Sequence, residues 1–164
     1  MEDHLTLLPK PIKREKRAPK PLKRSRPRKQ RKTTVAKLRR MLWERFRNYV
    51  KDRDGRICFT CDSGPLEGSN CHAGHLVNST KASVRYAPFN VYVQCYRCNV
   101  SMRGNIAEYA YRYIQRFGKE QFDRLMLQSR EHKTWTAHEL EALIAAATKS
   151  AADYEMFYAE KYWL

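Results

Sequence analysis

Two cysteine pairs are the residues of this sequence whose spacing most clearly predicts chemistry. They read 58-CFTC-61 and 95-CYRC-98, with 33 residues between them. A CxxC pair can place two thiolates within the roughly 2.3 Å bond length of one Zn²⁺, and two such pairs complete a closed tetrahedron. We therefore predict that Cys58, Cys61, Cys95 and Cys98 bind a structural zinc ion that joins the ends of an inserted substructure. Because four thiolates leave no open position for water, any catalysis must lie elsewhere.

A disulfide scaffold is the other common use of five cysteines in a short chain. The first residues, MEDHLTLLPKPIKREK, contain no apolar run of signal-peptide length, and no segment approaches the roughly 20 apolar residues of a membrane span. We therefore expect a reducing, cytoplasmic setting without a membrane partner, where paired cysteines more often bind metal. Cys71 lies outside the pairs, and we expect it to be a buried small hydrophobic residue rather than a ligand.

Polar residues inside and just after the segment between the two cysteine pairs resemble the motif of a known protein family. The elements 58-CFTC-61, 74-GH-75 and 90-NVYVQCYRCN-99 resemble those of the HNH, or ββα-metal, nucleases. With 86-YAPFNVYVQCYRCN-99 and 103-RGN-105 added, the sequence is similar, over roughly residues 50–120, to the phage recombination protein family known as NinG or Rap. The zinc pairs and the terminal asparagine are also similar to those of the phage junction resolvase endonuclease VII.

The resemblance implies roles for three residues. His75 would be the general base that takes a proton from the water attacking a phosphodiester, which suits an imidazole of ordinary pKa about 6.5. Asn90 would hold the loop between the strands, or the histidine itself, by hydrogen bonds. Asn99 would present its side-chain oxygen to a catalytic Mg²⁺ or Mn²⁺. The implied function is a metal-dependent endonuclease acting on branched DNA, such as Holliday junctions and D-loops, in phage homologous recombination in the host cytoplasm.

One position departs from the family pattern. Many members carry Asp or His before the catalytic histidine as a second cation ligand, whereas this sequence has Gly74. Simpler roles also remain open, because Asn90 could only shape a turn and Asn99 could only cap a following helix. Candidates for a second ligand are His72, Asp62, Asn105 and Glu108.

Hydrophobic periodicity predicts the elements that must hold these residues in place. Apolar residues at three- and four-residue steps predict helices over 34–51, from after Met102 to Gly118, over 119–130, and from Thr136 to about Tyr162. Short strands are predicted in 71–78 and 89–95. The second alternates Val91 and Val93 with Tyr92 and Gln94, which is typical of a half-buried strand.

These elements predict an α+β fold. We expect a small zinc-fastened ββα-metal, HNH-like core flanked by α-helices, where the identity of the core is implied by the resemblance. The expected parts are a disordered basic arm (1–33), an N-terminal helix (34–54), the zinc-bound core (55–118) and C-terminal helices (119–164).

The charge distribution favours a polyanionic partner. Residues 1–40 hold sixteen Lys and Arg against three acidic residues, which accounts for thirteen of the sixteen net positive charges. Such a Pro-rich, charged segment cannot bury enough apolar area to fold alone, and its cations near phosphates would release counterions. A solvated tail that only maintains solubility is the plainer interpretation. The candidate nucleic-acid contacts are Lys13, Arg14, Lys23, Arg24, Arg28, Arg31, Arg39, Arg40, Lys81, Arg85 and Arg103.

Branched or double-stranded DNA is thus the expected partner, and two rival functions stay open. The first is a non-catalytic, zinc-scaffolded DNA-binding recombination accessory protein, in which Gly74 marks a lost metal site. The second is an RNA-binding zinc protein, given the aromatic content. The last predicted helix could pack on the core or pair with a second copy in a homodimer, through the stripe formed by Leu140, Leu143, Ile144, Ala147 and Ala151.

Overall fold

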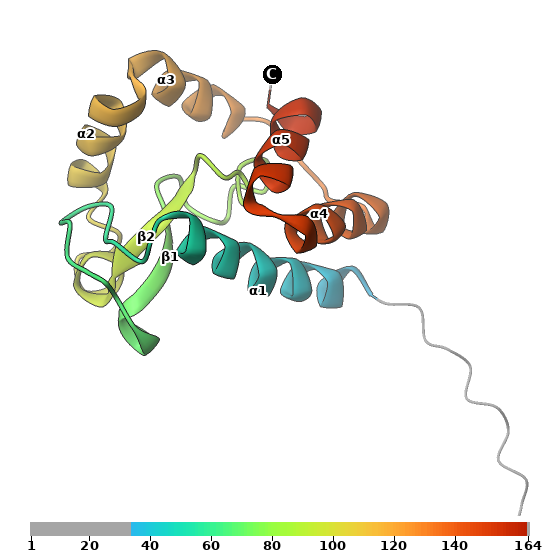
Figure 1. Cartoon of the computed structure of the whole chain (residues 1–164). Coiled ribbons are helices and arrows are strands. Elements are labelled where there is room, and N and C mark those ends of the chain that lie inside the picture. Colours follow the sequence, from blue (N-terminus) through green and yellow to red (C-terminus); the bar gives the residue numbers. More distant parts are fainter. Residues whose placement is uncertain (1–33, 164) are drawn as a thin grey trace, which may run out of the picture. The chain divides into compact units, whose positions relative to one another are not determined.

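The computed structural model describes residues 34–163, which form five α-helices around a two-stranded hairpin. The elements, labelled in Figure 1, are α1 (Val35–Arg53), β1 (Cys71–His75), β2 (Val91–Cys95), α2 (Ile106–Phe117), α3 (Lys119–Gln128), α4 (Ala137–Lys149) and α5 (Ala151–Tyr162). A 3₁₀ turn, Gly68–Asn70, precedes β1, and a π-helical turn, Arg97–Ser101, follows β2. The mixed α+β class is therefore confirmed. The arm predicted over residues 1–33 lies outside the described residues.

Helix α1 begins and ends where the sequence predicts. The side chain of Thr34 accepts a hydrogen bond from the backbone N–H of Lys37, which satisfies one of the free donors of the first turn. Leu42 and Phe46, in the middle of its apolar stripe, are fully buried. Within the described residues, no helix combines the length and apolar character that crossing a membrane requires.

The hairpin is antiparallel, and its register pairs Cys71 with Cys95 and His75 with Val91. All five residues of β2 are buried, so the prediction of a half-buried strand was wrong. The reason is that both faces are covered. The His75 ring packs on Trp43 of α1, whereas Tyr92, which points to the other face, contacts Tyr109 and Tyr113 of α2.

The last helical segment is divided, although the sequence predicts one helix from Thr136 to about Tyr162. Ser150 has an extended backbone (φ −155°, ψ 170°), and its hydroxyl accepts a hydrogen bond from the N–H of Asp153, so it caps α5. Serine favours this N-cap position over a helix interior. The break allows α5 to bring the hydroxyls of Tyr154 and Tyr158 to the carbonyls of Tyr86 and Ser83 in the loop between the strands.

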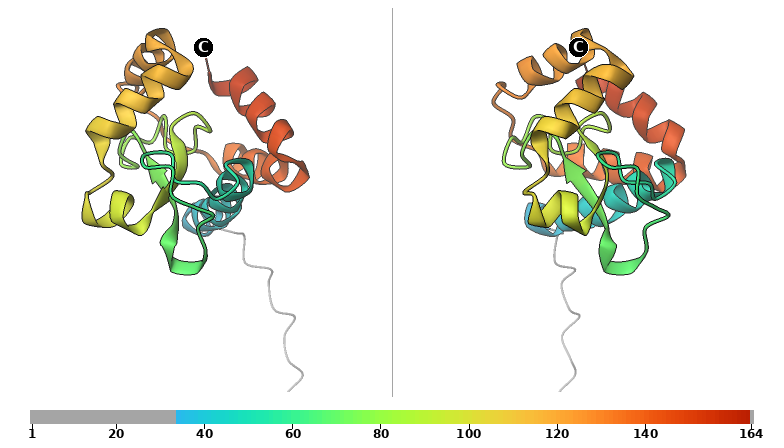
Figure 2. Two further views of the ribbon diagram at one scale, coloured as in Figure 1. Left: turned by 60° about the vertical axis from the view of Figure 1, so that its left-hand side comes forward. Right: turned by 90° about the vertical axis from the view of Figure 1, so that its left-hand side faces the viewer.

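Helix α4 uses part of its apolar stripe inside this chain. Leu140 and Leu143 are fully buried, and α4 packs against α1. In both views of Figure 2, α1 and α4 lie next to each other. Pairing of two copies through this helix stays a prediction.

An ion pair at the end of α1 attaches that helix to the hairpin. The Arg53 guanidinium bonds the Asp54 carboxylate (2.6 Å) and donates to the carbonyls of Pro88 (2.7 Å) and Val91 (2.8 Å). The second oxygen of Asp54 accepts from the N–H of Val93 (2.8 Å). Both side chains are largely buried, with 16% and 13% exposed. The pair therefore holds both the loop and β2 in position relative to α1.

We expect Arg53→Met to lower the free energy of unfolding by about 3–5 kcal/mol, because removing one partner leaves the Asp54 charge buried without its counterion. Urea denaturation followed by circular dichroism measures the loss. Arg47→Met, on the exposed face of the same helix, is the matched control and should change stability by less than about 0.5 kcal/mol. An equally small loss of stability in both variants would show that the Arg53–Asp54 ion pair contributes little to the free energy of unfolding.

Candidate functional site

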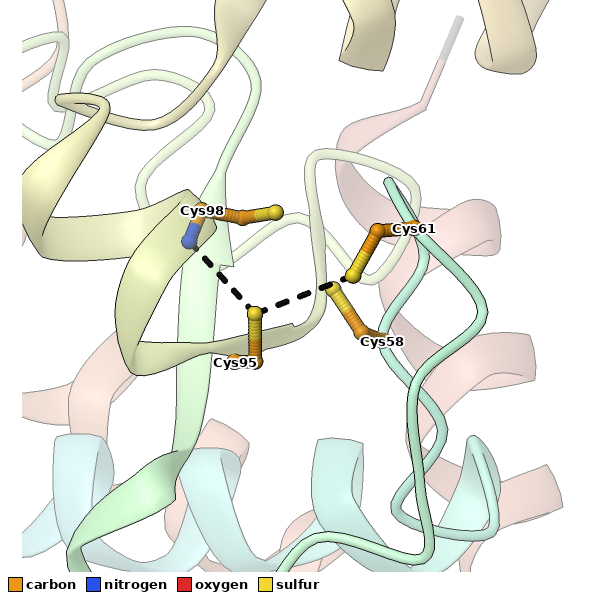
Figure 3. A group of neighbouring side chains, drawn as sticks. All are labelled: Cys58, Cys61, Cys95 and Cys98. Atoms are coloured by element: carbon orange, nitrogen blue, oxygen red, sulfur yellow. Dashed lines mark hydrogen bonds between the residues drawn. The ribbon is translucent and has the colours of Figure 1, made fainter.

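The four paired cysteines form one cluster. Cys58 and Cys61 lie in the loop after α1, Cys95 ends β2, and Cys98 lies in the π-helical turn. Figure 3 shows their sulfurs directed toward one another, and the four sulfur atoms all lie within 4.8 Å of each other. The sulfurs of Cys61 and Cys95 are 3.8 Å apart. A tetrahedral site with Zn–S bonds of about 2.3 Å has S···S edges of about 3.8 Å, so these residues fit a structural zinc ion.

Backbone hydrogen bonds set the geometry of the first pair. The N–H of Cys58 donates to Ser63 O (2.8 Å), and the N–H of Asp62 donates back to Cys58 O (2.9 Å), which closes a tight turn. The N–H of Phe59 donates to Val93 O (2.7 Å) and attaches this turn to β2. The two pairs are therefore held in the same region by backbone bonds as well as by any metal.

The surroundings of two of the sulfurs shift their pKa values in opposite directions. Burial by itself raises the pKa of the Cys58 thiol, but hydrogen bonds from Thr60 and from the backbone lower this pKa to about 6. Burial raises the pKa of Cys98 to about 12. Neighbouring thiolates repel one another, and a divalent ion removes this repulsion. Cys71 is buried and is not part of the cluster.

His75 lies at the end of β1, with its imidazole stacked on the Trp43 indole (centroids 5.3 Å apart, planes at 19°). Its Nε2 lies 3.0 Å from the carbonyl oxygen of Arg85. A carbonyl only accepts, so Nε2 carries the hydrogen and the neutral ring keeps its lone pair on Nδ1. Burial lowers the pKa of His75, and the positive charge of Arg85 lowers it further, while the bond to the Arg85 carbonyl opposes them. The imidazole is therefore neutral at pH 7, with one defined tautomer.

Asn90 is fully buried and bonds the loop between the strands. Its side-chain oxygen accepts from Val77 N–H (2.7 Å), and its amide nitrogen donates to the carbonyls of Val77 and Val84 (both 2.9 Å). All three hydrogen bonds of the Asn90 side chain are to the backbone of the loop, and none is to the His75 imidazole. They fix the loop that carries the Arg85 carbonyl.

Asn99 lies inside the π-helical turn, directly after Cys98. It is not an N-cap, because Tyr96 precedes this turn and Asn105 precedes α2, so the capping interpretation was wrong. Its side-chain oxygen lies 3.0 Å from the point where a Cβ on Gly74 would stand. The structure thus brings Asn99 next to the residue that precedes His75. His75 and Gly74 are adjacent on the strand and point to opposite faces of it.

Gln94 is a site residue that the sequence reasoning missed. Its amide nitrogen donates to Gly104 O (2.8 Å) and to the hydroxyl of Thr60 (3.3 Å). Its side-chain oxygen is buried and has no hydrogen-bond partner among the described residues, which ordinarily costs about 1–3 kcal/mol. A Cβ on Gly74 would collide with this oxygen and lie 2.8 Å from Gln94 Cδ. A polar residue in an otherwise apolar strand was the available signal.

The two carboxamide oxygens suit a hard divalent cation. Those of Gln94 and Asn99 both approach the space over Gly74, and Mg²⁺ and Mn²⁺ prefer oxygen ligands. The four residues considered as second ligands are engaged elsewhere. Asp62 and Glu108 both pair with Arg112, the Asn105 amide lies 3.9 Å from the Cys98 sulfur, and the His72 ring bonds Ser69 O.

The predicted nucleic-acid contacts fall into two groups. Arg39, Arg40, Lys81 and Arg103 have exposed side chains, and Arg85 is partly buried beside the imidazole. Burial raises the pKa of the Tyr86 hydroxyl, while the charges of Arg85 and Arg39 both lower it, so these two cations lie near the same group. The remaining residues, Lys13, Arg14, Lys23, Arg24, Arg28 and Arg31, lie outside the described part of the chain.

Comparison with known proteins identifies relatives from bacteriophages. Residues 8–155 match the family model described as bacteriophage lambda NinG protein. The NinG proteins of Enterobacteria phage H19B and Escherichia phage lambda are each 29% identical to the chain over 107 residues, and that of Salmonella phage P22 is 28% identical. Each alignment covers 64% of this chain and 51–52% of the relative, so the chain spans about half the length of these curated relatives. No solved structure matches the chain.

We expect the purified, reduced protein to contain one zinc ion per chain, because the four sulfurs form a complete tetrahedral set. Cys95→Ala should lose the metal and lower the thermal midpoint. Cys71→Ala, which removes a buried cysteine outside the cluster, should retain it. Elemental analysis by inductively coupled plasma mass spectrometry measures the content. Zinc that survives Cys95→Ala at full occupancy would contradict the assignment.

Proposed function

This chain belongs to the phage NinG family, and from that membership and the site geometry we propose that it is a metal-dependent, HNH-type endonuclease. Its substrate is branched DNA, such as Holliday junctions and D-loops, and its role is in phage homologous recombination. The proposal extends to the relationship with endonuclease VII, for which the support is the positions of the zinc pairs and of the final asparagine.

The observation that carries the proposal is the state of His75. Donation from Nε2–H to the Arg85 carbonyl leaves Nδ1 unprotonated, and the lowered pKa keeps the ring in this basic form at neutral pH. A general base needs both properties. In the proposed step, Nδ1 takes a proton from water, the water oxygen attacks phosphorus, and the bond to the leaving 3′ oxygen breaks. That oxygen then takes a proton from solvent.

A divalent cation held near Asn99 would support the same chemistry from the other face of β1. Asn99 would hold Mg²⁺ or Mn²⁺, and the ion would supply charge stabilisation for the phosphate and the leaving oxygen. A zinc ion bound by the four cysteines would have no such role, since sulfur would fill all four ligand positions. It would fix Asn99, which follows Cys98 directly, relative to the hairpin whose first strand ends at His75.

Cations near the imidazole favour a phosphate substrate. Arg39 on α1 and Arg85 in the loop both lie near the Tyr86 hydroxyl. Three further cations are exposed, namely Arg40, Lys81 and Arg103. Contacts of this kind bind the DNA backbone and carry no base specificity, which suits an enzyme that recognises the shape of a branch.

The second candidate function is a non-catalytic DNA-binding accessory protein. The observation in its favour is Gly74, since no carboxylate from that position reaches the candidate cation site. Both functions predict binding to branched DNA, but only the nuclease predicts incision that requires a divalent cation. A four-way-junction cleavage assay with and without Mg²⁺ separates them.

We expect His75→Ala to slow incision of a four-way junction by about 10²- to 10⁴-fold, the usual contribution of a positioned general base. Junction binding in a gel-shift assay should stay unchanged. Because burial lowers the pKa of His75, the rate of the parent protein should fall on acidification only at a pH lower than the ordinary histidine pKa of about 6.5. Single-turnover rates measured between about pH 5 and 8 provide the test.

His72→Ala is the matched control, because this histidine lies on the same strand but bonds Ser69 rather than the loop that bears Arg85. It should cut at the parental rate. Undiminished incision by His75→Ala would eliminate the imidazole as the base. Absence of incision by the parent protein with every divalent cation tested would instead favour the accessory function.

We expect removal of residues 1–32 to weaken junction binding and to reduce its dependence on salt, because fewer phosphate contacts release fewer counterions. The slope of log Kobs against log salt concentration should fall by about 0.9 for each lost phosphate contact in duplex DNA. Fluorescence anisotropy at several NaCl concentrations measures both quantities. An unchanged slope would mean that the segment makes no phosphate contacts.

A further inference from the structure

We propose that Gln94 is a second protein ligand of the catalytic cation, and that its oxygen stands where a side chain at position 74 would otherwise reach. The inference rests on the proposed function for the identity of the cation as Mg²⁺ or Mn²⁺. It adds a ligand residue to that function. It also explains how a chain with glycine before the histidine can still present two side-chain oxygens to one ion.

The orientation of the Gln94 amide is fixed by its neighbours. Gly104 O, 2.8 Å from Nε2, can only accept a hydrogen bond, so exchanging the amide nitrogen and oxygen would place two acceptors against each other. The Thr60 hydroxyl is the second group near Nε2. Oε1 therefore points away from Gly104, toward β1, and is left without a partner among the described residues.

Gly74 provides the space into which this oxygen points. Any Cβ at position 74 would overlap Gln94 Oε1 and approach Cδ to 2.8 Å. Glycine inside a strand weakens it, and its presence commonly marks a close approach by another group. The approaching group here is a carboxamide oxygen. A residue with a side chain at position 74 and the present conformation of Gln94 exclude each other.

Asn99 brings a second oxygen to the same point. Its Oδ1 lies 3.0 Å from the Cβ position of Gly74, so two carbonyl-type oxygens converge there, and Gln94 Oε1 accepts no hydrogen bond from the described residues. Convergent oxygens attract a hard cation, and Mg²⁺ and Mn²⁺ accept neutral amide oxygens together with water and phosphate. Because both amide ligands are neutral, the DNA phosphate must supply the negative charge that balances the cation. The cation should therefore bind much more tightly in the presence of DNA, and DNA more tightly with the cation.

The test measures Mn²⁺ binding rather than cleavage. The full-length, zinc-loaded chain carries His75→Ala so that the four-way junction stays intact, and electron paramagnetic resonance follows the loss of the free Mn²⁺ signal, with junction alone as the reference. Gln94→Ala should weaken Mn²⁺ binding by about 10- to 100-fold, similar to Asn99→Ala. Gln115→Ala, an exposed glutamine of α2, should leave it unchanged.

A rescue variant keeps the inference falsifiable if Gln94→Ala disturbs folding. Gly74→Asp with Gln94→Ala places a carboxylate in the vacated space and should restore Mn²⁺ binding, whereas Gly74→Asp alone should not, because Gln94 still occupies that space. Zinc content and thermal midpoint identify misfolded variants. Failure of the double variant to regain Mn²⁺ binding would overturn the inference.

Other outcomes separate the inference from the proposed function. Parental Mn²⁺ affinity in Gln94→Ala, with Asn99→Ala impaired, would mean that the Asn99 amide simply donates to Gln94, and the ligand role would be rejected while the nuclease stands. Loss of Mn²⁺ binding in Gln94→Ala, together with a parent protein (His75 intact) that does not cut the junction with any divalent cation, would support the ligand role and reject the nuclease.

Discussion

The arrangement of this protein depends on four sulfur atoms that must share one small volume. A two-stranded hairpin is marginally stable by itself, and the loop that follows α1 has little regular structure to hold it. A metal bound by Cys58, Cys61, Cys95 and Cys98 would stabilise both the loop and the hairpin, because it would join that loop to the end of β2. Asn99 follows the last ligand in the chain, so its position is determined by the same closure.

The loop between the strands is held by elements far from it in sequence. The Trp135 indole donates to Ala82 O (2.9 Å), and the hydroxyls of Tyr158 and Tyr154 donate to Ser83 O and Tyr86 O. Asn90 adds its bonds from inside the loop. The carbonyl of Arg85, which determines the tautomer of His75, therefore lies in a segment fixed on several sides. The helices after residue 135 thus contribute to the proposed base without touching it.

Features encoded over short sequence distances could be predicted from the sequence. The CxxC spacing identified the four clustered cysteines, the periodicity over 34–51 located α1 to within two residues at each end, and Gly118 marked the end of α2. The adjacency of Cys98 and Asn99 placed the asparagine beside the cluster. The division at Ser150 was missed because an alanine-rich stripe on either side of a serine has the same periodicity whether or not the helix is interrupted.

Features that depend on long-range contacts could not be predicted. Full burial of β2 requires α2 to cover its second face. The hydrogen bonds of the Arg53–Asp54 ion pair require the loop carbonyls to lie beside the end of α1. Gln94 looked like the polar side of a half-exposed strand. Only the tertiary structure shows that its oxygen is buried over Gly74 and faces Asn99, where the sequence suggested that a ligand had been lost.

The close approach of Gln94 to Gly74 has a consequence for how such a chain can diverge. An aspartate at position 74 would collide with Gln94 in its present conformation, and a smaller residue at 94 would open a void as long as glycine remained at 74. The effect of a substitution at either position therefore depends on the residue at the other, which makes the two positions an epistatic pair.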